Sequence, residues 1–281
     1  MQGKLYLCAT PIGNLEDITL RVLRTLKEVD LIAAEDTRNS IHLLNHFDIK
    51  TPLTSYHEYN KVDKAYQLVE KMQHGKNIAL ITDAGTPGIS DPGEDLVRIC
   101  YEQGIEVTSL PGAAACITAL TLSGLSTRRF AFEAFLPREK KERAQILREL
   151  VDETRTIIVY EAPHHLLQTL KELQNTLGNR RITICRELTK KFETAFCTDF
   201  AQAIAYYETE GIRGECVIVI EGKNPEELRK EQQQAWEEMS IEEHMEHYLS
   251  QGMDKKNAMK AVAKDRGIGK RDVYQMLLEK E

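Results

Sequence analysis

The chain has 281 residues, a net charge of −7, and 42% hydrophobic and 29% charged residues, which describes an ordinary globular protein with room for about two domains. The negative charge argues against a protein that coats nucleic acid nonspecifically, and no apolar run reaches the roughly 18 residues of a membrane span. Residues 1–4 lead straight into a predicted strand, which leaves no room for a signal peptide, so we expect a cytoplasmic protein.

The chain opens with a predicted strand, helix and second strand. Residues 4–9 are an apolar run, a helical pattern covers about Ile18 to Glu28, and residues 31–34 are a second apolar run. Such a βαβ unit implies a parallel sheet with right-handed crossovers. No GxGxxG follows the first strand, so neither a dinucleotide-binding Rossmann domain nor the commonest methyltransferase loop is indicated.

Polar clusters follow two of the early strands. Residues 35–38, Glu-Asp-Thr-Arg, come directly after the second strand, and residues 55–58, Ser-Tyr-His-Glu, follow a short strand near Leu53. The carboxyl ends of parallel strands form the edge at which open α/β sheets bind ligands. The acids of 35–38 also suit the N-terminus of a helix. His57 also fits an ordinary surface imidazole, and both alternatives stay open.

The most informative stretch is the loop at 82–93, Thr-Asp-Ala-Gly-Thr-Pro-Gly-Ile-Ser-Asp-Pro-Gly, which joins a buried strand at 77–81 to a helix from Glu94. Its three glycines permit close backbone approach and positive φ, and its two prolines stiffen it. Asp83 and Asp91 place two carboxylates beside this bare backbone, which suits a polar ligand with hydroxyls or amines. We interpret the loop as a binding loop rather than a plain tight turn.

Further strand–helix pairs are predicted in the second half of the body. A strand at 105–110 leads into Pro-Gly-Ala-Ala-Ala at 111–115, whose small residues at a helix N-terminus let a ligand approach backbone N–H groups. An aromatic strand at 130–135 precedes a basic stretch at 136–143, which suits either a solvated helix start or a phosphate-bearing substrate. Later strands are predicted at 156–160, 180–185 and 214–220.

The sequence contains no metal, redox or hydrolase motif. The six cysteines show no CxxC spacing and no close histidine, and most lie inside apolar runs, as reduced core cysteines do. The pair at 164–165, His-His, has no Cys or carboxylate at ligand spacing and is predicted to be structural. Residues 88–91, Gly-Ile-Ser-Asp, lack the GxSxG nucleophile elbow.

Residues 224–281 are predicted to form a separate helical domain. The stretch 224–250 has eight glutamates and only two cations, whereas 253–272 has seven cations and three aspartates. An apolar pattern predicts helices at 255–264 and 270–278 joined by a glycine turn, which is the spacing of a helix-turn-helix. Such a pair indicates either nucleic-acid binding or a dimer contact.

Taken together, these segments resemble the tetrapyrrole (corrin/porphyrin) methylase family over about residues 5–222. Thr10-Pro11 stands where the family has Gly-Pro, and Gly85-Thr86-Pro87 stands where its tetrapyrrole enzymes have Gly-Asp-Pro. Pro111-Gly112 matches the family's Pro-Gly, and Gly214-Glu215 matches a small-residue contact on the last strand. Further motifs resemble the branch that methylates a cytidine ribose 2′-oxygen in the decoding region of small-subunit ribosomal RNA: residues 35–38, 56–58, 135–138 and 186–190.

The resemblance implies an α/β fold of two tetrapyrrole-methylase-type subdomains with the cofactor cleft between them, plus a small C-terminal all-helical domain. We place the domains at residues 1–110, 111–223 and 224–281. The implied cofactor is S-adenosyl-L-methionine, and the implied partner is 16S ribosomal RNA or the assembled small ribosomal subunit, with no membrane and with a homodimer left open. Because a sulfonium methyl is already activated, neither a metal nor a covalent nucleophile is expected.

The resemblance and the strand ends together define the candidate site residues. The candidates for cofactor binding are Pro11, Ala84, Gly85, Thr86, Pro87, Ile89, Ala114, Ala115, Glu161, Leu188, Gly214 and Glu215. The candidates for the base, which the sequence does not rank, are Asp36, His57, Glu58 and Lys190. The candidates for RNA binding are Glu35, Arg38, Tyr56, Arg138, Lys140, Lys141, Lys255, Lys256, Lys270 and Arg271.

Two other functions stay open at this point. An enzyme of the same fold could methylate a tetrapyrrole or a protein side chain, although the basic clusters and the basic tail favour RNA. A non-enzymatic RNA-binding protein could use the tail alone, although ligand-type loops at four strand ends argue against it.

Overall fold

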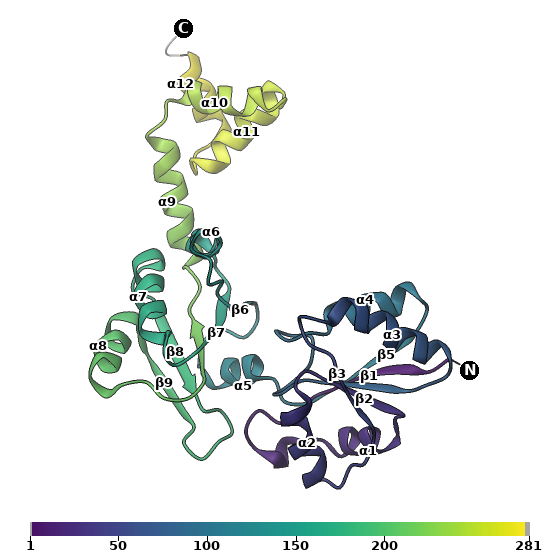
Figure 1. Ribbon diagram of the computed structural model, residues 1–281. Helices are drawn as coiled ribbons and strands as arrows, with labels where there is room; N and C mark the ends of the chain where they lie inside the picture. Colours follow the sequence, from purple (N-terminus) through teal and green to yellow (C-terminus); the bar gives the residue numbers. More distant parts are fainter. Residues whose placement is uncertain (1, 279–281) are drawn as a thin grey trace. The chain divides into compact units, whose positions relative to one another are not determined.

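The computed structural model describes residues 2–278, whose helices and strands are labelled in Figure 1. These residues form two compact units, the first made of residues 2–151 and 155–221 and the second of residues 152–154 and 222–278. The first unit holds two five-stranded sheets, and the second is helical. The domain limits at 110 and 223 stay a prediction.

The first sheet has the strand order β3-β2-β4-β1-β5 and is parallel throughout, as the βαβ opening predicted. Its strands are β1 (Lys4–Cys8), β2 (Leu31–Ala34), β3 (Leu53–Ser55), β4 (Ile78–Ile81) and β5 (Glu106–Leu110). Its helices are η1 (Leu15–Asp17), α1 (Leu20–Glu28), α2 (Thr37–His46), α3 (Lys61–Gln73) and α4 (Glu94–Glu102). The predicted first helix begins at Leu20 because the Thr19 side chain accepts a hydrogen bond from the Val22 N–H and caps it.

Helices cover both faces of this sheet (Figure 1). Leu96 and Leu68, from α4 and α3, pack with Leu80 on one face, whereas Leu26 of α1 packs with Ile32 on the other. All four residues of β4 are therefore buried, as expected for a continuous apolar run in a parallel sheet. Because the strands are parallel, the loops that follow β1, β2, β4 and β5 all emerge at one edge.

The second sheet has the order β6-β7-β10-β8-β9, in which only β6 and β7 run parallel. Its strands are β6 (Phe130–Phe135), β7 (Thr156–Glu161), β8 (Arg181–Arg186), β9 (Thr194–Asp199) and β10 (Cys216–Ile220). Its helices are α5 (Ala115–Leu122), α6 (Lys140–Glu149), η2 (Leu150–Asp152), α7 (Leu166–Leu177) and α8 (Phe200–Glu210). The sequence did not predict β9, an edge strand without a buried residue and hence without an apolar run.

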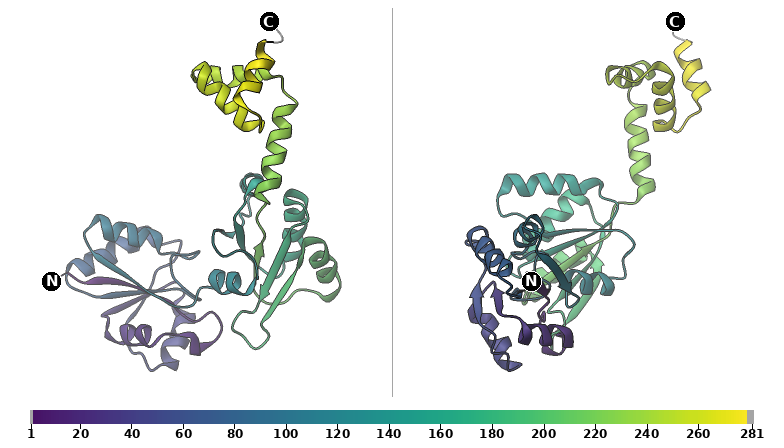
Figure 2. Two further views of the ribbon diagram at one scale, coloured as in Figure 1. Left: turned by 180° about the vertical axis from the view of Figure 1, so that it is seen from behind. Right: turned by 90° about the vertical axis from the view of Figure 1, so that its right-hand side faces the viewer.

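The second sheet is also covered on both faces, which can be followed in Figure 2. Leu120 of α5 packs with Val219 on one face, and Leu170 of α7 and Phe200 of α8 pack with Ile218 on the other. Truncating a side chain such as Phe200 would cost about 3–5 kcal/mol of unfolding free energy. This packing holds the ends of β7 and β10 in place.

The second unit is built from four helices: α9 (Pro225–Glu237), α10 (Ile241–Ser250), α11 (Lys255–Asp265) and α12 (Lys270–Leu278). Helices α11 and α12 lie at the positions predicted for the helix-turn-helix pair and pack with α10 around Val262 and Val273 (Figure 2). The Trp236 ring stacks on the buried His244 ring, with centroids 3.9 Å apart. Among residues 2–278, no helix is both long and apolar enough to cross a membrane.

Candidate active site

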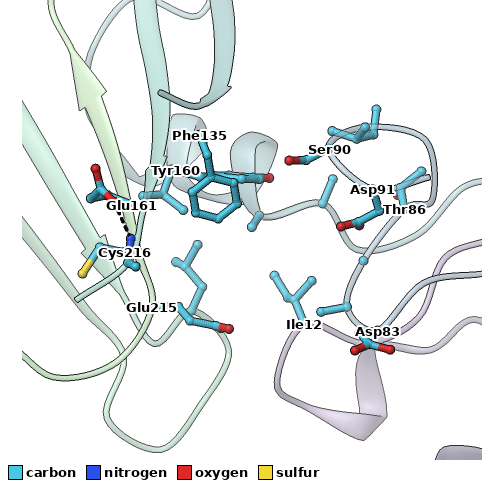
Figure 3. A pocket seen from close by; sticks show the side chains of 18 of the residues that line it. Ile12, Asp83, Thr86, Ser90, Asp91, Phe135, Tyr160, Glu161, Glu215 and Cys216 are labelled. Atoms are coloured by element: carbon cyan, nitrogen blue, oxygen red, sulfur yellow. Dashed lines mark hydrogen bonds between the residues drawn. The ribbon is translucent and has the colours of Figure 1, made fainter. Parts of the chain in front are cut away.

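A cavity of about 500 Å³ lies in the first unit, between the loops at the edge of the first sheet and the ends of strands in the second (Figure 3). We call it the main pocket. The loops that follow β1, β2, β4 and β5 contribute Ile12, Glu35, Asp83, Ala84, Gly85, Thr86, Ile89, Ser90, Asp91, Ala114 and Ala115. The second sheet and its loops contribute Phe135, Tyr160, Glu161, Ala162, Pro163, Leu188, Glu215, Cys216 and Val217.

Most of the residues predicted to bind the cofactor are brought together here. Those that line the main pocket are Ala84, Gly85, Thr86, Ile89, Ala114, Ala115, Glu161, Leu188 and Glu215. Three others, Pro11, Pro87 and Gly214, do not line it but are each next in sequence to a residue that does. The assignment of these residues to a cofactor stays a prediction.

The loop after β4 is held by its neighbours on both sides. The backbone groups of Thr10 and Gly85 exchange two hydrogen bonds, with N–O distances of 2.9 and 3.1 Å. On the other side, the Thr86 hydroxyl donates to the Ala113 carbonyl at 2.9 Å. Gly85 has φ +87°, and a Cβ at this position would lie 3.2 Å from the Ile12 side chain. A glycine is therefore required by both backbone conformation and space.

Three carboxylates gather on the first-sheet side of the main pocket: Glu35, Asp83 and Asp91. Glu35 accepts a hydrogen bond of 2.6 Å from the Thr82 hydroxyl, and Asp83 accepts one of 2.8 Å from the Asn39 amide. Burial raises the pKa of Asp91 above its ordinary value, and the negative charges of Glu35 and Asp83 add to that rise. The pocket thus presents an acidic wall suited to cations and hydroxyls.

The residues proposed as bases lie outside the lining of the main pocket. Asp36 caps α2, because its Oδ1 accepts from the Arg38 N–H at 2.8 Å while its Oδ2 pairs with the guanidinium. These bonds to Arg38 hold the pKa of Asp36 at about 2, which makes it a weak proton acceptor. The helix-cap alternative for this residue is confirmed. Glu58 forms an ion pair with Lys61, and the His57 ring lies 3.3 Å from the Asn60 amide.

Lys190 lies at the rim of the main pocket beside two glutamates, and its role as the base stays a prediction. Its Nζ is 3.1 Å from Glu187 and 3.3 Å from Glu215, and Glu215 lines the pocket. Burial lowers the pKa of Lys190, but the bonds and charges of the two glutamates outweigh it and raise the pKa. The amine is therefore a cation at neutral pH. A Cβ at Gly13 would lie 2.5 Å from the Lys190 Cγ, so this glycine lets the lysine cross the loop after β1.

One predicted RNA contact is wrong. Tyr56 was a candidate for RNA binding, but it is 0% exposed and packs among Leu68 and Leu80 in the core. The cause is strand pairing, because the Tyr56 N–H donates to the Ala34 carbonyl and extends the β2–β3 register by one residue. Its ring therefore lies in the core beneath α3 and α4.

The other RNA candidates divide into several surfaces. Glu35 lines the main pocket, and the exposed Arg38 pairs with Asp36. Exposed residues after β6 are Arg138, Lys140 and Lys141, whereas Lys255 and Lys256 lie on α11 and Lys270 and Arg271 on α12. The two units are separate bodies, so the tail lysines are described apart from the main pocket.

Sequence reasoning missed part of the lining. Phe135 and Tyr160 stand at the ends of β6 and β7, and Cys216 begins β10. Strands β6 and β7 were predicted, so the position of Phe135 and Tyr160 at the ends of these strands could have identified both residues. Asp91 was recognised as part of the binding loop but was not assigned a role.

Comparisons with known proteins agree with this geometry. The family model of tetrapyrrole (corrin/porphyrin) methylases matches residues 4–204. The chain is 49% identical over 275 residues to "Ribosomal RNA small subunit methyltransferase I" of Halalkalibacterium halodurans, covering 98% of this chain and 94% of that protein. The protein of the same name from Bacillus subtilis is 48% identical over 272 residues, 97% of this chain and 93% of that protein. The one from Thermotoga maritima is 44% identical over 221 residues, 79% of this chain but 99% of its own length.

Solved structures resemble the chain more distantly. Diphthine synthase superposes with a TM-score of 0.61 at 13% identity, over 78% of this chain and 90% of its own. Uroporphyrin-III-C-methyltransferase from Thermus thermophilus superposes with a TM-score of 0.56 at 18% identity, over 78% of this chain and 94% of its own. At these identities the likeness shows the fold alone, two α/β halves followed in this chain by helices.

Proposed function

The chain belongs to the tetrapyrrole (corrin/porphyrin) methylase family, and from that premise we propose that it is an S-adenosylmethionine-dependent methyltransferase of small-subunit ribosomal RNA. We assign the reaction to the ribose 2′-oxygen of a cytidine in 16S ribosomal RNA and place the protein in the cytoplasm. The substrate assignment rests on relatives of 49% and 48% identity, matched over nearly their whole length, whose names specify the small ribosomal subunit. The main pocket is the observation that supports the chemistry.

The main pocket fits the chemical groups of S-adenosylmethionine. Ile12, Leu188 and Val217 supply apolar walls for an adenine ring. The acidic wall suits the sulfonium and ammonium charges and the ribose hydroxyls. The bare backbone around Gly85 lets a ligand approach closely. Its volume of about 500 Å³ is within the usual range for small-molecule sites.

When bound, the cofactor supplies a methyl group on a sulfonium, which is already an activated leaving group. The chain must then position the ribose hydroxyl and accept its proton. Asp91 is suited to accept the proton because its pKa is raised, which brings it closer to the pKa expected of a general base at neutral pH. With the cofactor bound, the pocket would hold the 2′-oxygen against the sulfonium methyl, and Asp91 would accept the hydroxyl proton as that oxygen is methylated.

A methyl-transfer assay decides among the candidate substrates. Naked 16S RNA, assembled small subunits and a porphyrinogen are offered in parallel with labelled cofactor, and nucleoside mass spectrometry locates the methyl group. We expect transfer to the ribose of a cytidine in one of the RNA substrates. A methyl group on a base would refute the 2′-oxygen assignment, and transfer to the porphyrinogen alone would favour the tetrapyrrole alternative. Absence of cofactor binding would favour the non-enzymatic alternative.

Helix α11 supports a role for the tail in holding RNA. Lys256, Lys260 and Lys264 are four residues apart, so they share one face, and all three are exposed. None of them forms an ion pair within residues 2–278. The Thermotoga relative, matched over 99% of its length by 221 residues, has the size of the first unit alone. We therefore propose that the tail adds affinity while the first unit performs catalysis.

Changing these three lysines together to alanine should weaken RNA binding about tenfold or more and reduce the slope of log K against log salt by about 2–3. Cofactor affinity should stay unchanged. The control replaces Lys27, Lys50 and Lys71 in the first unit, which are also exposed, although Lys50 pairs with Asp48. Titration of fluorescent RNA at several salt concentrations makes the measurement. Equal slopes for the two triple variants would assign the tail another role.

A further inference from the structure

A second cavity, of about 730 Å³, adjoins the main pocket and shares Phe135, Glu161 and Ala162 with it. We call it the side pocket. Its other walls include Arg138, Arg143 and His165. The assignments made so far give it no role.

The wall between the two pockets is fixed by a chain of hydrogen bonds. The Ala162 N–H donates to one oxygen of Glu161 at 2.8 Å, and the Thr169 hydroxyl donates to the other at 2.6 Å. The Arg143 guanidinium in turn donates to Thr169 at 2.7 Å and to Glu172 at 2.6 Å. Glu161 is only 7% exposed, and both of its oxygens accept hydrogen bonds. The shared wall is therefore rigid and already satisfied.

A β-bulge directs an aromatic ring to the boundary of the two pockets. The β6–β7 register shifts between Phe132 and Phe135, and Ala134 between them has φ +50°. Bulges of this kind re-aim a side chain and occur beside functional sites. Phe135 is 57% exposed, and its ring packs against that of Tyr160 in a T-shaped arrangement with centroids 5.5 Å apart. Phe135 is thus an exposed aromatic ring held against Tyr160 at the boundary of the two pockets (Figure 3).

The side pocket also holds a cation that is free to bind an anion. Arg138 is exposed and has no ion-pair partner in the described part of the chain, unlike Arg143. An aromatic face beside a free guanidinium is the combination that binds one nucleotide of a single strand, because the base stacks and the phosphate pairs with the charge.

We propose that the side pocket binds the nucleotide next to the target cytidine, with its base on Phe135 and its phosphate at Arg138. This inference rests on the proposed function and extends it, because it assigns the recognition of a flanking nucleotide to a named cavity. The shared wall explains why the two nucleotides occupy neighbouring pockets. A strand whose target ribose enters the main pocket passes directly over Phe135.

A double-mutant cycle between protein and RNA tests the assignment. The full-length chain, either wild type or Phe135→Ala, is titrated with a substrate RNA fragment that carries a normal or an abasic nucleotide on either side of the target cytidine. In the wild type, the abasic change on one side should weaken RNA binding about 10–100-fold, as expected for a lost base–aromatic stack. In Phe135→Ala the same abasic change should have less than about a threefold effect.

Controls separate this proposal from the others. Phe130→Ala removes a 38% exposed ring from the same strand outside both pockets and should keep the full abasic effect. Arg138→Gln should reduce the salt slope of RNA binding by about one, whereas Arg148→Gln on the exposed face of α6 should not. Arg138→Gln also tests the side pocket should Phe135→Ala fail to fold.

The outcomes are distinguishable. If the wild type methylates RNA but the abasic and Phe135→Ala effects simply add, the flanking-nucleotide proposal is wrong and the proposed function stands. If Phe135→Ala weakens cofactor binding as strongly as RNA binding, the ring belongs to the main pocket alone, and the proposal is again overturned. If the wild type methylates no RNA, the proposed function itself fails, and this inference fails with it.

Discussion

A Gly85→Val chain is expected to stay folded and to lose cofactor binding by more than 100-fold. Valine at φ +87° costs about 1–3 kcal/mol in backbone strain, and its Cβ would lie 3.2 Å from Ile12 and 3.4 Å from the Ala113 carbonyl. The loop after β4 must then shift away from the loops after β1 and β5, and these three loops form one side of the main pocket. Calorimetric titration with S-adenosylmethionine measures the loss.

Gly104→Val is the matched control for this variant. Gly104 also has positive φ, +69°, but a Cβ there meets nothing within 4 Å, and it does not line the main pocket. The control therefore has similar backbone strain and should bind the cofactor as the wild type does. Should Gly85→Val keep wild-type affinity, the main pocket is not the cofactor site, whatever Gly104→Val does.

An Asp91→Asn chain should methylate RNA about 10²–10⁴-fold more slowly at saturating cofactor. Asparagine keeps the shape of the side chain but cannot take up the hydroxyl proton. In the wild type, the single-turnover rate should rise with pH through the raised pKa of Asp91, and in the variant this rise should be lost. Asp83→Asn, from the same loop, is the control that keeps the buried carboxylate. Equal rates for Asp91→Asn and the wild type would contradict the assignment.

The same variant has a predictable effect on stability. The folded-state pKa of Asp91 is raised, so ionisation opposes folding, and the wild type loses stability as the pH rises from the unfolded-state pKa through the folded-state pKa. Asp91→Asn should therefore melt above the wild type at neutral pH, and this difference should vanish in acid, where both side chains are neutral. Slower methylation together with higher stability is expected when a carboxylate whose ionisation opposes folding is kept for its function.

Local sequence determined much of this protein. The apolar run of β4 and the glycines and prolines of 82–93 predict a buried strand and a ligand loop, because both signals lie within a few residues. The parallel first sheet follows from the βαβ order, and the start of α9 follows from Asn224, whose side chain caps the Glu226 N–H at 2.9 Å. Most of the predicted cofactor contacts line one pocket because they stand at or beside strand ends, where α/β sheets bind ligands.

Tertiary structure alone decided how the strands of the second sheet pair and which side chains meet. β10 lies antiparallel between β7 and β8, and this non-local pairing sets Glu215 and Cys216 at the main pocket. The register of β2 and β3 likewise buried Tyr56, which was predicted from the sequence to contact RNA at the surface. A bulge in β6 turned Phe135 outward. The raised pKa of Asp91 depends on burial and on Glu35, which is remote in sequence. Such properties arise from contacts between distant segments, and no local pattern contains them.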